Sequence, residues 1–269
     1  MPELPEVETT LRGIAPWLDG QLIERLEVRQ PRLRWPVPDA VQRSVGQAVT
    51  GLRRRAKYIL IETSAGSLML HLGMSGSMRV LPEWVTPGKH DHFDIVTAGA
   101  VLRFNDPRRF GSLLWLDRRD DGHPLLDSLG PEPLGDHFDG RHLWRHSRGR
   151  KLAVKSFIMD GKIVVGVGNI YASEALFMAG IHPSRPAGRI AAARYDGLAE
   201  AIRDVLGRAI RDGGTSLRDF TGAGGTPGYF AQNLLVYGRD GQPCLQCSRP
   251  LRQKVIGQRS SYYCVFCQR

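Results

Sequence analysis

The sequence predicts an α+β fold in which a helix and a β-rich domain precede a helical domain and a short C-terminal hairpin that binds a metal. Three observations predict it. Apolar residues recur at helical spacing near the start, short β-rich runs with turn residues fill residues 21–116, and four cysteines stand in two pairs between residues 244 and 267. So many short strands favour a sandwich or a barrel.

Length and composition limit the class of protein. The 269 residues suffice for one large domain or two modest ones, and 42% hydrophobic with 24% charged residues excludes a disordered chain. No apolar run approaches the roughly 18 residues of a membrane span, and the start lacks the features of a signal peptide, so we expect a cytoplasmic protein with no membrane partner. A net charge of +10 favours a polyanionic partner such as nucleic acid, or else a solvated basic surface.

The first helix is predicted to begin at Leu4 and to end before Gly20. Its apolar positions recur every three or four residues: Leu4, Val7, Leu11, Ile14 and Leu18. Strands are predicted in the runs that follow, with turns at residues 65–66 and 98–100: Tyr58–Glu62, Ser67–Leu72, Phe93–Thr97, Val101–Phe104 and Ser112–Leu116.

A linker rich in Asp, Gly and Pro is predicted over residues 117–135. The helices predicted beyond it lie near residues 139–147, 152–160, 169–179 and 190–212. Two glycines precede Asn169, which predicts Asn169 as an N-cap whose helix could receive a phosphate. The segment TGAGGTPG at residues 221–228 predicts a loop almost without side chains.

The cysteines form two Cys-x-x-Cys pairs with sixteen residues between them, which is the spacing of a zinc ribbon. The four ligands of this structural site are Cys244, Cys247, Cys264 and Cys267. Disulfides or unligated thiols are the alternatives, and a cytoplasmic location disfavours disulfides. Two short strands with a turn at Gly257 are predicted between the pairs, and a zinc ion would stabilise so short a hairpin.

Pro2 is the first candidate catalytic residue. Removal of the initiator Met leaves a secondary amine that titrates near neutral pH and can form a cationic iminium with a sugar aldehyde carbon. Glu3 and Glu6 lie within one helical turn of it and could protonate a sugar oxygen or hold the amine. Lys57, at the end of an Arg-rich run, could meet a phosphate. Alternatively, Pro2 merely starts a helix, the glutamates favour its first turn, and Lys57 marks a strand edge.

Two further segments have the composition of a DNA contact. The turn Asn105-Asp-Pro-Arg-Arg-Phe-Gly111 carries two cations and an aromatic side chain suited to a backbone grip and a wedge between bases. The pair His90 and His92 could hold a metal or a phosphate, and the absence of a third ligand at a recognisable spacing disfavours the metal.

Taken together, the motifs resemble those of bacterial formamidopyrimidine-DNA glycosylase over essentially the whole chain. The matching segments are Pro2-Glu-Leu-Pro-Glu-Val-Glu8, His71-Leu-Gly-Met-Ser-Gly76, Lys89-His-Asp-His92, Asp106-Pro-Arg-Arg-Phe-Gly111, Val165-Gly-Val-Gly-Asn-Ile-Tyr-Ala-Ser-Glu174, Gly228-Tyr-Phe-Ala231 and the four-cysteine ribbon. The resemblance implies a β-sandwich, a helix-two-turns-helix domain and a zinc-finger hairpin, divided at residues 1–130, 131–235 and 236–269.

The implied activity is base-excision repair of oxidised purines, with flipping of the damaged nucleotide followed by strand nicking. By resemblance, the Pro2 amine attacks C1′, Glu3 is the general acid on the sugar, and Glu6 supports the amine. Lys57 matches the proton donor for β-elimination, and Arg259 matches the residue linked to δ-elimination.

The resemblance also implies which residues contact DNA. It further implies that the chain acts as a monomer on duplex DNA and is located in the bacterial cytoplasm, at the nucleoid. Met74, Arg108 and Phe110 match the side chains that fill the gap left by the flipped base. The other matching DNA-binding positions are His90, Arg150 and Asn169. Residues 216–229 match the loop that closes over the extruded base, and Arg150 stands where relatives often have Lys, which changes the phosphate geometry.

Two alternatives stay open at this point. An endonuclease VIII-type enzyme shares the N-terminal proline but prefers oxidised pyrimidines. A non-catalytic DNA clamp would result if Met1 were retained, because the nucleophile would then be held in a peptide bond.

Overall fold

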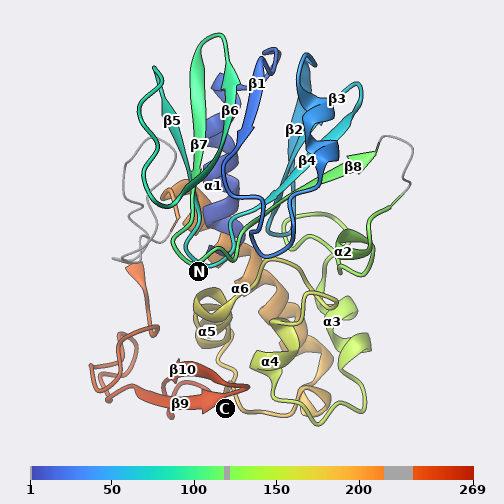
Figure 1. Ribbon diagram of the computed structural model, residues 1–269. Coiled ribbons are helices and arrows are strands. Elements are labelled where there is room, and N and C mark those ends of the chain that lie inside the picture. Colours follow the sequence, from blue (N-terminus) through green and yellow to red (C-terminus); the bar gives the residue numbers. More distant parts are fainter. Residues whose placement is uncertain (1, 118–121, 215–232) are drawn as a thin grey trace. The chain divides into compact units, whose positions relative to one another are not determined.

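The computed structural model describes residues 2–117, 122–214 and 233–269, which form two compact units (Figure 1). The first unit comprises Met1–Asp127 and Asp212–Ala231, and the second comprises Ser128–Arg211 and Gln232–Arg269. The loop predicted at residues 221–228 lies outside the described residues. None of the helices in the described ranges has the length and apolar character that a membrane crossing requires.

The N-terminal helix is shorter than its apolar pattern predicts. Helix α1 spans Leu4–Ile14, and a 3₁₀ turn, η1, continues it over Ala15–Trp17. Pro16 explains the difference, because it has no N–H to donate to the preceding turn and its ring crowds that turn's carbonyl. Leu18 is still buried, so the apolar stripe serves the core across the change of helix type.

Two four-stranded antiparallel sheets make up most of the rest of the first unit, so the β domain is a sandwich (Figure 1). One sheet has the order β1-β6-β7-β5, built from Arg25–Val28, Asp91–Thr97, Ala100–Asn105 and Ser77–Leu81. The other has the order β2-β3-β4-β8, built from Val49–Arg55, Tyr58–Thr63, Gly66–His71 and Ser112–Asp117. The five predicted strands are confirmed; β1, β2 and β5 complete the sheets.

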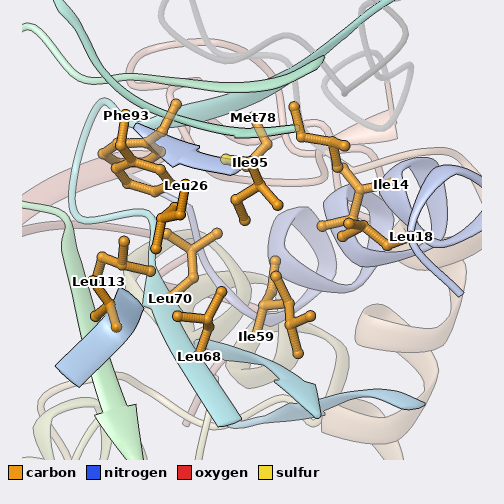
Figure 2. Packing of buried hydrophobic residues seen from close by; sticks show 14 of the residues in the cluster. Ile14, Leu18, Leu26, Ile59, Leu68, Leu70, Met78, Phe93, Ile95 and Leu113 are labelled. Atoms are coloured by element: carbon orange, nitrogen blue, oxygen red, sulfur yellow. The ribbon is translucent and has the colours of Figure 1, made fainter. Parts of the chain in front are cut away.

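The sandwich core lies between the inner faces of the two sheets, with α1 against it (Figure 2). The residues labelled in the figure are Ile14, Leu18, Leu26, Ile59, Leu68, Leu70, Met78, Phe93, Ile95 and Leu113. Alternate residues of one strand reach this core, as Ile59 and Ile61 of β3 do, which is the period-two pattern of a strand with one inner face. Because the two sheets pack on this core, the loops that join their strands are held in fixed positions.

The second unit contains the predicted helices. They are α3 (Gly140–Ser147), α4 (Val154–Ile158), α5 (Asn169–Met178) and α6 (Ala192–Arg211), with a 3₁₀ turn, η3, at Ala187–Arg189. Helix α6 packs against α3 and α5. The predicted linker includes a short helix, α2 (Pro124–Asp127), and α2 is preceded by residues 118–121, which lie outside the described ranges. η2 (Asp39–Ser44) belongs to the first unit.

The C-terminal hairpin has the predicted form. Strands β9 (Arg252–Ile256) and β10 (Arg259–Tyr263) pair in antiparallel register, from Ile256 opposite Arg259 to Arg252 opposite Tyr263. Gly257 and Gln258 form the turn, and both have positive φ, of 55° and 60°. A small core of Val236, Leu251, Cys244 and Cys264 joins the hairpin to Phe177 of α5.

Candidate functional site

The N-terminal proline is buried together with two carboxylates. Glu3 is 2% exposed and Glu6 is 3% exposed, and Oε2 of Glu6 accepts a hydrogen bond of 2.7 Å from the backbone N–H of Glu3. Glu6 therefore holds the turn that carries Pro2. Gly214, the last described residue before 215–232, lies beside Glu6, since a Cβ placed there would be 3.3 Å from Oε1 of Glu6.

Lys57 occupies the tight turn between β2 and β3. Ala56 precedes it with a φ of 54°, a conformation that usually requires glycine in such a turn. The positive charge of Lys57 acts on His71 at the end of β4. Burial, and then the charges of Lys57 and Arg34, lower the pKa of His71 to about 4. The structure thus places Lys57 in a basic region beside an uncharged imidazole.

Met74, Arg108 and Phe110 lie on two loops that pack against each other. The Met74 loop, Leu72–Gly76, follows β4, and the Arg108 loop, Asp106–Gly111, joins β7 to β8. The two touch at the backbone, because a Cβ on Gly73 would lie 2.4 Å from the N of Gly111. The guanidinium of Arg108 lies 4.9 Å above the ring of Phe110, which is 41% exposed.

The two histidines of the Lys89-His-Asp-His92 segment differ in their surroundings. The carbonyl of His90 accepts the backbone N–H of Asp106 at 3.0 Å, and His90 is half-buried. His92 is buried, and its Nε2 is 2.7 Å from the carbonyl oxygen of Asp106. Among the described residues, neither histidine belongs to a group of side chains that could hold a metal ion.

The prediction that Asn169 is an N-cap is wrong. Gly168 is the N-cap of α5, and Asn169 is the first helical residue. Its side chain instead spans to the hairpin: Nδ2 donates to the carbonyl of Ser260 at 3.1 Å and to the Tyr237 hydroxyl at 3.3 Å. Because Ser260 follows Arg259 directly, Asn169 fixes the strand that carries Arg259.

Arg150 and Arg259 are both exposed. The Nε of Arg150 donates to the carbonyl of His146 at 2.7 Å, and its guanidinium lies 5.6 Å above the ring of Phe157. These contacts orient Arg150 at the C-terminal end of α3.

The four cysteines converge. All four Sγ atoms lie within 4.8 Å of one another, and the cysteines are not joined by disulfides. Sγ of Cys244 is 3.9 Å from that of Cys267, and Sγ of Cys247 is 3.5 Å from that of Cys264. Four thiolates at this spacing could hold one metal ion.

Comparison with known proteins decides the family. Residues 1–113 match the model of the formamidopyrimidine-DNA glycosylase N-terminal domain, and residues 129–221 match that of the formamidopyrimidine-DNA glycosylase H2TH domain. Curated formamidopyrimidine-DNA glycosylases of Syntrophotalea carbinolica and Alcanivorax borkumensis are 60% and 62% identical to the chain, each over 100% of both sequences. The chain belongs to the formamidopyrimidine-DNA glycosylase family.

Solved structures of formamidopyrimidine-DNA glycosylases share the fold. The Fpg (MutM) protein of Thermus thermophilus is 37% identical with a TM-score of 0.89, covering 99% of this chain and 98% of that one. A Lactococcus lactis Fpg mutant in complex with DNA containing Fapy-dG is 30% identical with a TM-score of 0.92, over 100% of both chains. The Lactococcus lactis Fpg in complex with abasic-site DNA has a TM-score of 0.91 at 31% identity, over 99% of both chains.

Sequence reasoning missed two side chains that the structure places at the candidate sites. His71 stood in a matching motif but received no role. Lys155, 1% exposed, donates to Asn169 Oδ1 at 2.7 Å, to the Ser260 carbonyl at 3.0 Å and to Ser261 Oγ at 2.7 Å. Nothing in the sequence around Lys155 signals a buried lysine, since its partners lie far along the chain.

Proposed function

We propose that this chain is a bifunctional DNA glycosylase and abasic-site lyase that removes oxidised purines, such as 8-oxoguanine and formamidopyrimidines, from duplex DNA. The observation that carries the proposal is the burial of Glu3 and Glu6 beside Pro2, with the 2.7 Å hydrogen bond that holds this turn. Family membership supports the reaction class, and DNA lesions are present in complexes of Lactococcus lactis relatives.

The chemistry begins once Met1 is removed and Pro2 carries a secondary amine. The unprotonated amine attacks C1′ of the flipped nucleotide, the C1′–N bond to the base breaks, and the base leaves with the proton that the nitrogen of Pro2 gives up. Glu3 gives a proton to the ring oxygen of the sugar, the ring opens, and the nitrogen of Pro2 becomes an iminium. Glu6 holds the backbone of Glu3, and thereby the amine, in place.

The iminium then acts as an electron sink for strand cleavage. Loss of a proton from C2′ expels the 3′ phosphate by β-elimination, and a second elimination expels the 5′ phosphate. Lys57 and Arg259 are the cations we assign to the leaving phosphates, and hydrolysis of the iminium releases Pro2. The neutral His71 beside Lys57 has Nδ1 occupied by the N–H of Gly73 at 2.9 Å, so its Nε2–H is the donor that can face a phosphate.

Oxidised purines are favoured over oxidised pyrimidines by the pair of loops described above. An exposed Phe110 and an Arg108 that lies over it suit a wedge and a guanidinium that hydrogen-bonds the opposite cytosine. Met74, on the adjoining loop, is the third of the side chains that we assign to the gap left by the flipped base. His90, Arg150 and Asn169 are assigned to the DNA backbone, and the protein acts as a monomer.

The four cysteines fit one structural zinc ion. A tetrahedral zinc site with Zn–S distances of about 2.3 Å separates its sulfurs by about 3.8 Å, close to the Sγ separations of 3.9 and 3.5 Å. The ion would complete a closed site without an open position for catalysis. Its contribution would be to stabilise the hairpin that carries Arg259.

The test is base excision by Glu3→Gln, with Glu8→Gln as its matched control on the same helix. Glu8 is bound to Arg12 and Arg54, at 2.9 and 3.0 Å, rather than to the N-terminal turn. We expect Glu3→Gln to lower single-turnover excision of 8-oxoguanine opposite cytosine by about 100-fold or more, because the general acid is lost. Glu8→Gln should retain excision. Equal rates for Glu3→Gln and the wild type would contradict the assignment.

A further inference from the structure

Asp106 lies at the junction of the two loops, and its carboxylate is fully buried at 0% exposed. Oδ1 accepts the hydroxyl of Ser75 at 2.7 Å and the backbone N–H of Arg108 at 3.2 Å. Oδ2 accepts the backbone N–H of Gly111 at 2.8 Å. One carboxylate thus binds the Met74 loop through Ser75 and both ends of the segment that carries Arg108 and Phe110.

The backbone of Asp106 is itself anchored to β6 and the turn before it. Its N–H donates to the carbonyl of His90 at 3.0 Å, and its carbonyl oxygen is 2.7 Å from Nε2 of the buried His92. Its carbonyl also accepts the N–H of Arg109 at 3.2 Å, and Arg109 has a φ of 56°, which is costly for a residue other than glycine. The loop is held in a strained turn by contacts that converge on Asp106.

We propose that Asp106 is a positioning residue that sets the arrangement of Arg108 and Phe110 relative to Met74, and so determines how well the enzyme reads the base opposite the lesion. It binds the backbone of Arg108 and not the guanidinium, which lies over Phe110 and stays exposed to reach DNA. This inference rests on the proposed function.

The geometry explains why a carboxylate is required. The groups facing Oδ1 and Oδ2 are two backbone N–H donors and a hydroxyl, and only a group with two acceptor oxygens satisfies them together. In Asp106→Asn, either orientation of the amide turns its NH₂ toward a backbone N–H, of Gly111 or of Arg108. The loop must then shift to separate the two donors.

The experiment compares the wild type with Asp106→Asn and Ser75→Ala. Ser75→Ala removes the side-chain hydrogen bond between the loops but leaves the bonds from the Arg108 and Gly111 backbone N–H groups to Asp106 intact. Asp94→Asn is the control, because Asp94, on β6, is also a fully buried carboxylate and accepts hydrogen bonds from Arg29 and Arg103 instead of from either loop. Three substrates are used: duplex 8-oxoguanine opposite cytosine, the same lesion opposite adenine, and a single-stranded abasic oligonucleotide.

An abasic single strand has no base to extrude and no partner base to read, so its cleavage reports on the amine and the elimination steps and not on the reading of the opposite base. Asp106→Asn should lower excision opposite cytosine by about 10- to 100-fold, the effect of a misplacement of about 1 Å, and narrow the preference for cytosine over adenine. Ser75→Ala should have a smaller effect in the same direction. Both should cleave the single strand within about 2-fold of the wild type, and Asp94→Asn should keep the cytosine preference.

Loss of duplex and single-strand cleavage in equal proportion would overturn the inference, because it would mean a general structural role. An unchanged preference for cytosine in Asp106→Asn would also overturn it. If Asp106→Asn does not fold, an unchanged preference in Ser75→Ala has the same meaning. If the wild type excises no 8-oxoguanine, it is the proposed function that fails, and the inference that rests on it falls too.

Discussion

His71 is a histidine whose environment removes its charge over the physiological pH range. It accepts a hydrogen bond from the N–H of Gly73, packs against Tyr58 with 4.9 Å between ring centroids, and lies near Lys57, Arg34 and Asp106. Burial is the largest cause of its lowered pKa, the charges of Lys57 and Arg34 add to it, and Asp106 opposes it. A proton on His71 is therefore unfavourable in the folded chain.

The stability of the protein should depend on pH through His71. The unfolded histidine titrates near 6.5 and the folded one near 4, so the unfolded chain binds more protons between these values. The free energy of unfolding is then highest above pH 6.5 and falls as the pH is lowered toward 4. Between pH 7 and pH 5 the free energy of unfolding of the wild type should fall by about 2 kcal/mol more than that of His71→Asn. In this variant the amide oxygen replaces Nδ1 as the hydrogen-bond acceptor. Denaturant unfolding at both pH values measures this, and parallel losses would rule out the lowered pKa.

The role of a residue could be predicted from the sequence where its partners are close along the chain. It could not be predicted where the partners lie far apart in the sequence. The capping turn of Pro2, Glu3 and Glu6 spans five residues, so its closeness follows from helical geometry. Asn169 was wrongly predicted as an N-cap because the competing partner, Ser260, is 91 residues away. A local pattern cannot show which long-range contact a side chain prefers.

At the scale of elements, the loop Asp106–Gly111 presents an aromatic side chain that contributes little to the core. Phe110→Ala should therefore change stability little, because the ring is 41% exposed. It should slow excision of 8-oxoguanine by about 10-fold or more, since the ring that we propose as the wedge between unstacked bases would be lost. Salt-dependent binding to plain duplex should change less.

The matched control is Trp84→Ala, in the loop after β5, which removes an aromatic ring that is 51% exposed. It should leave excision unchanged. Equal losses of excision and plain-duplex affinity in Phe110→Ala would count against the wedge.

Helices and strands with a clear hydrophobic periodicity could be predicted from the sequence, and those without one could not. Strand β3 has alternate core residues and was predicted within one residue of its end, whereas β2 is rich in arginine and has few apolar positions to mark it. Helix α1 was predicted too long because its apolar spacing continues past Pro16, where the backbone can no longer form the helical hydrogen bond. A polar strand or an edge strand forms because it pairs with a neighbouring strand, and the hydrophobic pattern of its own residues does not reveal that pairing.

At the scale of the whole molecule, the two units should respond differently to loss of the zinc ion that we propose for the four cysteines. Chelation, or Cys247→Ser, should release about one zinc ion per chain and unfold the hairpin, because so short a hairpin has little core of its own. Nicking of lesion duplex should be lost with it, while calorimetry should still show cooperative unfolding of the sandwich, whose core is separate. Retention of full nicking by a metal-depleted chain would contradict the structural role of zinc.

The central claim is that the amine of Pro2 becomes covalently bound to the sugar. The most direct measurement is borohydride trapping on a duplex with 8-oxoguanine opposite cytosine, using zinc-loaded protein whose mass shows that Met1 has been removed. The account predicts a reduced covalent adduct that peptide mapping assigns to Pro2. An adduct at a lysine such as Lys57, or no adduct at all, would contradict it.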